Sequence, residues 1–213
     1  MIRIERAGTR VGAGEGEWEP LRDHFLRHHW IRLPRLVDAP LLRTVQRGLG
    51  AATFFEVRHD HVTPPSIDVC MEPDGTSGML ELVCNDRAFL HAVESLTGCT
   101  PLSRFSGFVY RLTPGAGHHH NWHDDVVQGR RVAMSINLEA EPYAGGVLQI
   151  RERETGRVVE EVTNTGAGDA VLFRIDPSLQ HRVQPVTSGV KTAFAGWFRA
   201  ADPLLSVLRA EGA

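Results

Sequence analysis

The 213-residue sequence is poor in lysine, in cysteine and in long apolar stretches, and each shortage excludes a class of protein. Among 23 cationic residues only Lys191 is a lysine, and the net charge of −3 without a basic run argues against nucleic-acid binding. The cysteines, 3 in number and without ligand spacing, predict neither a disulfide framework nor a cysteine-based zinc site. No apolar run reaches the roughly 18 residues of a membrane helix. The opening residues carry no secretory signal, so we predict a cytoplasmic protein without a membrane partner.

The composition is that of one globular domain. With 42% hydrophobic and 23% charged residues, the chain is like ordinary folded proteins rather than disordered ones. No internal repeat or long linker divides it, so we predict a single domain over residues 1–213. Its expected parts are a helical front segment over about 1–103, a β-rich core over about 104–199 and a final helix over about 202–210. The sequence carries no signal for the oligomeric state.

The front segment is predicted to be mainly helical. Apolar residues recur at helical spacing over 18–29. After a short extended run, Asp38 is placed to cap a helix that runs to about Leu49, and Asp86 is placed to open one that ends at Gly98.

Residues 54–78 contain two adjacent prolines, polar clusters and glycines, so we predict a long irregular loop. Loops of this length serve as lids or binding loops. Arg58 in this segment is a candidate clamp for a substrate carboxylate, which would favour a free amino acid or a similar small acid as substrate. A solvated loop charge is the alternative.

From residue 104 onward the helical spacing gives way to short β-rich runs bounded by Gly, Pro, Asp or Asn. These runs are RFSGFVYRL, RRVAMSINLEA, GGVLQIRE, RVVEEVT, DAVLFRI, QHRVQPV and KTAFAGWFR. Roughly seven or eight short strands in about 95 residues are typical of a sandwich or jelly roll. We therefore predict a mainly β fold with flanking helices.

The densest functional signal is HHHNWHDD at residues 118–125, where a loop enters a predicted strand. Because side chains alternate faces along a strand, His123 and Asp125 should point to one side. A third ligand can come from His181, if its strand HRVQPV returns beside the first. Two histidines and one carboxylate on one face leave three positions of an octahedral metal open, the pattern of non-haem Fe(II) oxygenases. The three consecutive histidines 118–120 are expected to be solvated.

The single lysine lies ten residues after His181, beyond the hairpin signal TSG. A strand running in at His181 and back at Lys191 would place both side chains near the mouth of the barrel. In a chain that otherwise uses arginine, a single lysine indicates a position where the compact ammonium group on a flexible side chain is required.

Together these elements resemble the 2-oxoglutarate/Fe(II)-dependent dioxygenases, most closely the prolyl 4-hydroxylase-like branch. Over about residues 104–199 the family order is matched by PGAGHHHNWHDD, YAGGVLQI, GAGDAVLF, QHRVQPV and VKTAFAGWFR. The resemblance implies a double-stranded β-helix, or jelly roll, with the N-terminal helices packed on one face. It also implies Fe(II), 2-oxoglutarate as co-substrate, and O₂.

Residue by residue, the resemblance implies that His123, Asp125 and His181 are the catalytic iron ligands. Lys191 would pair with the distal carboxylate of 2-oxoglutarate. Trp197, six residues later on the same strand face, would line the iron pocket, although a core tryptophan is the alternative.

Two further co-substrate contacts stay open. Relatives often carry a tyrosine before the glycine loop and another on the strand after the ligand pair. Here Tyr110 lies further from the loop than usual, and Asn137 stands in the second place, where it could hydrogen-bond but is no phenol.

The resemblance implies hydroxylation of an unactivated C–H bond with release of succinate and CO₂; the carboxylate of Asp125 argues against a halogenase. Desaturation and ring closure stay open. The chain is compact and shows no partner-binding module, so a small molecule or amino acid is favoured as substrate over a protein. The alternatives are a prolyl or peptidyl hydroxylase acting on a protein, a cupin-like metal enzyme without 2-oxoglutarate, and a non-catalytic jelly-roll binding module.

Overall fold

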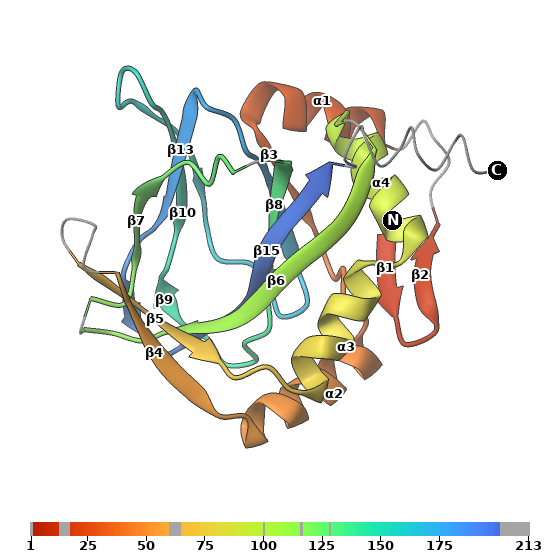
Figure 1. Ribbon diagram of the computed structural model, residues 1–213, viewed down its shortest axis with the longest axis vertical. Helices are drawn as coiled ribbons and strands as arrows, with labels where there is room; N and C mark the ends of the chain where they lie inside the picture. The colour runs from red at the N-terminus through yellow and green to blue at the C-terminus, as the bar shows by residue number, and fades with distance from the viewer. Residues whose placement is uncertain are drawn as a thin grey trace.

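The computed structural model consists mainly of two antiparallel β-sheets accompanied by a few helices (Figure 1). It describes residues 2–12, 18–59, 65–99, 101–115, 117–127 and 129–200, so the helix expected over 202–210 lies outside the described residues. The prediction of a mainly β fold with helices is confirmed. None of the helices in these ranges combines the length and the apolar character needed to cross a bilayer.

The strands fall into two larger sheets and two short pairs. In spatial order, the seven-stranded sheet contains β3 (Trp30–Leu33), β12 (Ala170–Arg174), β8 (Arg130–Asn137), β15 (Lys191–Ala200), β6 (Leu102–Leu112), β5 (Ser66–Met71) and β4 (Phe54–His59). The four-stranded sheet contains β11 (Val158–Val162), β10 (Leu148–Glu152), β13 (Leu179–Val183) and β7 (His120–His123). The short pairs are β1 (Ile2–Glu5) with β2 (Gly8–Val11) and β9 (Ala144–Gly145) with β14 (Val186–Ser188).

Four helices lie in the front half of the chain: α1 (Glu19–His28), α2 (Ala39–Ala51), α3 (Gly75–Cys84) and α4 (Arg87–Thr97). The predictions for α1, α2 and α4 are confirmed. Asp38 accepts a hydrogen bond from the Leu41 N–H at 2.8 Å, and Asp86 accepts one from the Ala88 N–H at 3.0 Å, so both carboxylates cap their helices as expected. Gly98 ends α4 in the left-handed conformation at φ 66°.

The loop predicted over residues 54–78 was wrong. β4 and β5 form an antiparallel hairpin in which Phe54 lies opposite Met71, and α3 follows. Pro65 precedes β5 and therefore removes no hydrogen bond from the ladder. β5 also pairs with β6, where Cys70 lies opposite Tyr110, and this contact between segments 40 residues apart has no local sequence signal.

The prediction of a mainly helical front segment was also wrong in part. Besides the hairpin of β4 and β5, it contains the β1–β2 pair, which joins Ile2 to Val11. Only β3 was expected there as an extended run. The front segment thus contributes three strands, β3, β4 and β5, to the larger sheet.

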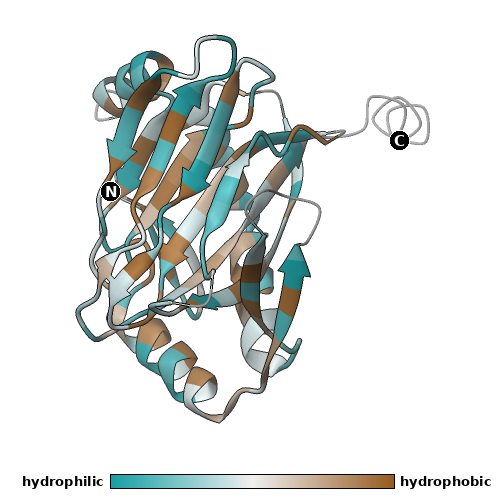
Figure 2. Ribbon diagram, turned by 90° about the vertical axis from the view of Figure 1, so that its left-hand side faces the viewer, coloured by the Kyte–Doolittle hydropathy of each residue, from teal (hydrophilic) through white to brown (hydrophobic). Residues whose placement is uncertain are grey.

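The seven-stranded sheet has an apolar core on each face. One core joins helix side chains to Phe105, Phe194 and Phe198, and the other lies between the two sheets and includes Tyr110 and Ala193. Side chains of a strand alternate between faces, so β15 contributes to both cores. In Figure 2 hydrophobic and hydrophilic residues follow one another along several strands.

Close strand packing makes Gly196 of β15 sensitive to substitution. A Cβ atom there would collide with the backbone of Ser106 and Gly107 on β6. We expect Gly196→Ala to lower the free energy of unfolding by about 1–3 kcal/mol, and so the melting temperature by about 2–10 °C in thermal unfolding followed by circular dichroism. Gly78→Ala is the control, because nothing lies within 4 Å of its added Cβ and alanine favours the helix. Equal melting temperatures for the two variants would contradict the close packing.

Candidate metal centre and its cavity

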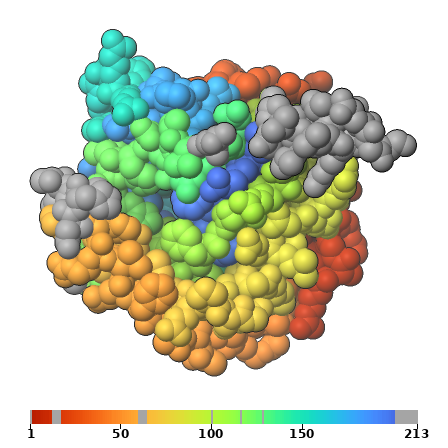
Figure 3. All heavy atoms as spheres, viewed as in Figure 1, coloured from red at the N-terminus to blue at the C-terminus, as the bar shows by residue number. Residues whose placement is uncertain are grey.

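A cavity of about 510 Å³ lies between the two sheets and is lined by residues of both. In Figure 3 the blue atoms of the β15 segment are seen in a hollow between green and yellow-green segments. Seven of the eight site residues expected from the sequence line this cavity: Tyr110, His123, Asp125, Asn137, His181, Lys191 and Trp197. The eighth, Arg58, is exposed on β4 and is not among the lining residues, whereas its neighbour His59 is.

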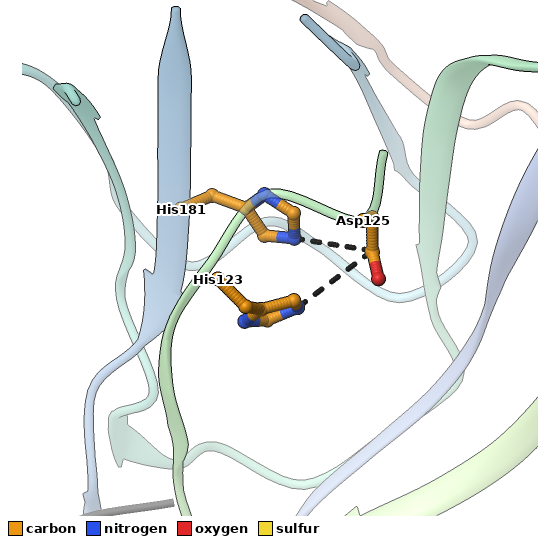
Figure 4. A group of neighbouring side chains, drawn as sticks. All are labelled: His123, Asp125 and His181. Carbon is orange, nitrogen blue, oxygen red and sulfur yellow. Dashed lines mark ion pairs between the residues drawn. The ribbon is translucent and has the colours of Figure 1, made fainter. Parts of the chain in front are cut away.

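His123, Asp125 and His181 converge at one place in this cavity (Figure 4). Their ligand atoms all lie within 4.8 Å of one another. Asp125 Oδ2 is 3.6 Å from His123 Nε2 and 3.4 Å from His181 Nε2. Around an octahedral ion with bonds of about 2.1 Å, neighbouring ligand atoms lie about 3 Å apart. The donor set and its spacing therefore fit one metal ion held on one face.

Strand pairing brings the two histidines together. β13 runs antiparallel to β7, with His181 directly opposite His123, and the two rings lie 4.2 Å apart between centroids. The expected return of the second strand beside the first is confirmed.

Asp125 reaches the group by a different route from the one predicted. β7 ends at His123, so alternation along a strand does not place the carboxylate, and that argument was wrong. Asp125 has a left-handed backbone at φ 55°, which aspartate tolerates better than most residues. The left-handed backbone at this residue, rather than strand alternation, directs its side chain to the histidines.

The carboxylate of Asp125 is oriented by two donors. Trp197 Nε1 donates to Oδ2 at 2.7 Å, and Arg130 Nη1 donates to Oδ1 at 3.2 Å. The Arg130 guanidinium stacks 3.5 Å from the centre of the Trp197 ring. Burial raises the pKa of Asp125, but His123 and His181 beside it outweigh this effect and hold that pKa far below the usual range. The group is therefore an anion, as a metal ligand requires.

The histidine environments select the ring nitrogens that face Asp125. His123 Nδ1 donates to the Asn121 carbonyl at 2.6 Å, which leaves Nε2 with a lone pair toward the cavity. His181 is buried beside Phe173, whose ring lies 4.7 Å away. Burial lowers the pKa of His181 to about 4, so this imidazole is neutral at pH 7. Neutral imidazole is the form that binds a metal.

Lys191 lines the cavity from the opposite sheet. Its side chain is buried, its Nζ donates to the Gly146 carbonyl at 2.6 Å, and burial lowers its pKa to about 8. The predicted hairpin from His181 to Lys191 was wrong. β13 and β15 belong to different sheets, and β14, which lies between them in the sequence, pairs with β9.

Tyr110 and Asn137 are both buried in the cavity wall, but they differ in how free their polar groups are to hydrogen-bond a ligand. Asn137 Nδ2 donates to the Thr165 carbonyl at 2.6 Å, and Oδ1 accepts from the Glu139 N–H at 3.1 Å. The amide therefore holds two backbone segments in place. Burial raises the pKa of the Tyr110 phenol, so it stays protonated and able to donate.

Sequence reasoning missed several lining residues. Tyr143 lines the cavity. The sequence contains only 2 tyrosines, Tyr110 and Tyr143, and this scarcity could have marked Tyr143 as a candidate site residue. Asp68 was hidden by the loop prediction, whereas His59 of the same segment was expected at the pocket wall and does line the cavity. The solvated state expected for histidines 118–120 was wrong for two of them, because His118 is 8% exposed and His120 lines the cavity.

Comparison with known proteins shows what the β-rich core of the chain resembles. Residues 106–199 match the family model of the 2OG-Fe(II) oxygenase superfamily. Over these residues the chain is similar to that superfamily. Over 95 residues the chain is 33% identical to a PKHD-type hydroxylase of Maricaulis maris, a match that covers 43% of this chain. The chain spans 41% of that relative's length.

Solved structures share the fold of this chain. A 2OG-Fe(II) oxygenase family oxidoreductase from Burkholderia pseudomallei has a TM-score of 0.69 at 12% identity, covering 90% of this chain and 93% of that one. A prolyl-4-hydroxylase from Pseudomonas putida has a TM-score of 0.61 at 18% identity, with coverage of 87% and 100%. The cofactors of the superfamily are Fe(II), 2-oxoglutarate and O₂, as the sequence predicted.

Proposed function

We propose that this oxygenase is an Fe(II)- and 2-oxoglutarate-dependent hydroxylase that acts on an unactivated C–H bond and releases succinate and CO₂. The observation that carries the proposal is the convergence of His123, Asp125 and His181 in a cavity that also contains a buried lysine. When bound, iron and 2-oxoglutarate supply the oxidation of the C–H bond by dioxygen.

The residues of the chain would divide this work between binding and orientation. Nε2 of His123 and His181 and a carboxylate oxygen of Asp125 would hold iron on one face and leave three positions open. Trp197 and Arg130 keep the carboxylate in place through the hydrogen bonds described above. The wall that Trp197 forms would exclude water from the reacting carbon.

The co-substrate would lie between the metal-binding group and Lys191. Lys191 would pair with its distal carboxylate, exchanging the Gly146 carbonyl for a stronger acceptor. Tyr110 would donate a hydrogen bond to the same molecule. Asn137 would shape the pocket through the backbone of Thr165 and Glu139 rather than by direct contact.

The two sheets would form a double-stranded β-helix, with the N-terminal helices packed on one face of the larger sheet. The two apolar cores on opposite faces of that sheet support this arrangement. The single domain over residues 1–213 and the cytoplasmic location stay predictions.

A small molecule or amino acid is the substrate we favour. The cavity volume of about 510 Å³ falls within the range of small-ligand pockets, which is roughly 300–1,000 Å³. Hydroxylation of a protein residue is the second candidate, and the similarity to a PKHD-type hydroxylase and to a prolyl-4-hydroxylase favours it.

Anaerobic reconstitution with Fe(II) and 2-oxoglutarate tests the proposed function. We expect the weak visible charge-transfer band of the iron chelate, and its loss in His181→Ala. His91→Ala is the matched control, because this histidine is 66% exposed on α4 and should leave the band unchanged. Bound iron without the band would favour the cupin-like alternative, and absence of iron binding would overturn the proposal.

A further inference from the structure

A second polar cluster lines the cavity beside the metal-binding group. Asp68 of β5 lies between two imidazoles: its Oδ2 is 3.0 Å from His59 Nε2, and its Oδ1 is 2.9 Å from His120 Nε2. The Asp68 side chain is 13% exposed, and all three residues line the cavity. The proposed mechanism uses none of them, so the cluster is available to a substrate.

This cluster presents a carboxylate to the cavity. Burial raises the pKa of Asp68, but the hydrogen bonds and charges of His120 and His59 outweigh it and lower that pKa, so the group is an anion. Its Oδ1 is buried against His120 Nε2, and the side chain keeps 13% of its surface exposed. A ligand group with N–H donors and a positive charge would complement the part of the carboxylate that faces the cavity.

Once Asp125 and Lys191 are assigned to metal and co-substrate, the carboxylate of Asp68 is the charged group that remains in this cavity for a substrate, apart from the imidazoles, among the described residues. Among the described residues, the charged side chains that line it are Asp68, Asp125 and Lys191, apart from the imidazoles. Asp125 faces the two histidine ligands, and Lys191 is assigned to the co-substrate. No arginine is among the lining residues of the described chain, and the expected carboxylate clamp Arg58 lies outside the cavity wall.

An aromatic wall connects the cluster to the metal-binding group. The Tyr110 ring lies 5.0 Å from that of His120, Phe108 lies 6.2 Å from Tyr110, and Trp197 lies 6.1 Å from Phe108. Trp197 in turn donates to Asp125. An apolar body could lie along this wall with its cation near aromatic faces, which attract positive charge.

We infer that Asp68, oriented by His59 and His120, determines the substrate class of this oxygenase: a small primary amine with an apolar body. The ammonium group would bind at Asp68, and the C–H bond to be hydroxylated would lie at the far end of the aromatic wall. This inference rests on the proposed function, because it names the substrate class of the same cavity.

Isothermal titration calorimetry with three six-carbon probes tests the inference: hexylamine, hexanoate and 1-hexanol. The full chain is titrated at pH 7.5, both metal-free and loaded anaerobically with Fe(II) and 2-oxoglutarate. We expect hexylamine to bind at least tenfold more tightly than either other probe in both forms. The metal-free titration excludes coordination of the amine to iron as the cause of the preference.

Substitution of the anion should remove this preference. In Asp68→Asn we expect at least a tenfold loss of hexylamine affinity, with unchanged affinity for 1-hexanol and for 2-oxoglutarate. Glu56→Gln is the matched control, because it removes an exposed carboxylate from the adjacent strand and should retain the preference.

Wild-type protein alone can overturn the inference, so it stays testable even if Asp68→Asn does not fold. Hexylamine binding no tighter than 1-hexanol, or tighter binding of hexanoate, would refute an ammonium site. Failure of the proposed function would look different: iron or 2-oxoglutarate would not bind, while the preference for hexylamine persisted.

Discussion

Replacement of Asp125 by alanine is expected to abolish hydroxylation and to weaken iron binding by at least about 100-fold. The variant loses the anionic member of the ligand group and leaves the Arg130 guanidinium near two imidazoles without a counter-charge. Iron content after dialysis and the rate of succinate formation from 2-oxoglutarate are the measurements. Both should fall together, because without the metal there is no oxidation of either substrate.

The neighbouring carboxylate provides the control for this prediction. Asp124 pairs with Arg153 at 2.7 Å and accepts from the Val126 N–H at 3.0 Å, so it lies outside the ligand group. Asp124→Ala should retain iron and turnover. An Asp125→Ala protein with wild-type turnover would refute the assignment of the metal ligands.

Lys191→Ala is expected to raise the dissociation constant of 2-oxoglutarate by about 30-fold or more. Removal of one partner from a buried, hydrogen-bonded charge pair costs about 2–5 kcal/mol. Iron binding should be unchanged, because Lys191 lies on the opposite sheet from the two histidines. Anaerobic titration of the iron-loaded protein measures both quantities. An unchanged constant for 2-oxoglutarate would assign the carboxylate contact to another residue.

The pH dependence of this binding gives Lys191 a second signature. Burial lowers its pKa to about 8, so the free site loses its positive charge as the pH rises through that value. The dissociation constant of 2-oxoglutarate should therefore rise about tenfold between pH 7 and pH 9. Lys191→Arg keeps its charge over this range and should flatten the profile.

Local signals explain which parts of the fold could be predicted from the sequence. The caps Asp38 and Asp86 act on N–H groups two or three residues away, and short β-rich runs bounded by turn residues marked the strands of the core. The parts that were missed depend on distant partners. The hairpin of β4 and β5 joins the sheet through Cys70 and Tyr110, a pairing that no local pattern encodes.

In the candidate site, too, local features could be predicted from the sequence, whereas contacts between distant segments could not. The three residues proposed as metal ligands could be picked out because metal chemistry restricts ligands to a few residue types, and the structure brings these three together. The position of Asp125 was predicted on a strand argument, yet its left-handed backbone directs the side chain. The cluster around Asp68 could not be found, because β4, β5 and β7 bring its members together from separate parts of the sequence.

The alternation along β15 makes this strand intolerant of a change in length. Phe194 and Phe198 belong to the helix-side core, whereas Lys191 and Trp197 line the cavity. One inserted residue after Ala193 would leave Lys191 in place but turn Phe194 into the cavity and Trp197 into the core. Such an insertion would separate the proposed co-substrate contact from the donor that orients Asp125. The two faces of β15 therefore fix the length of this strand together.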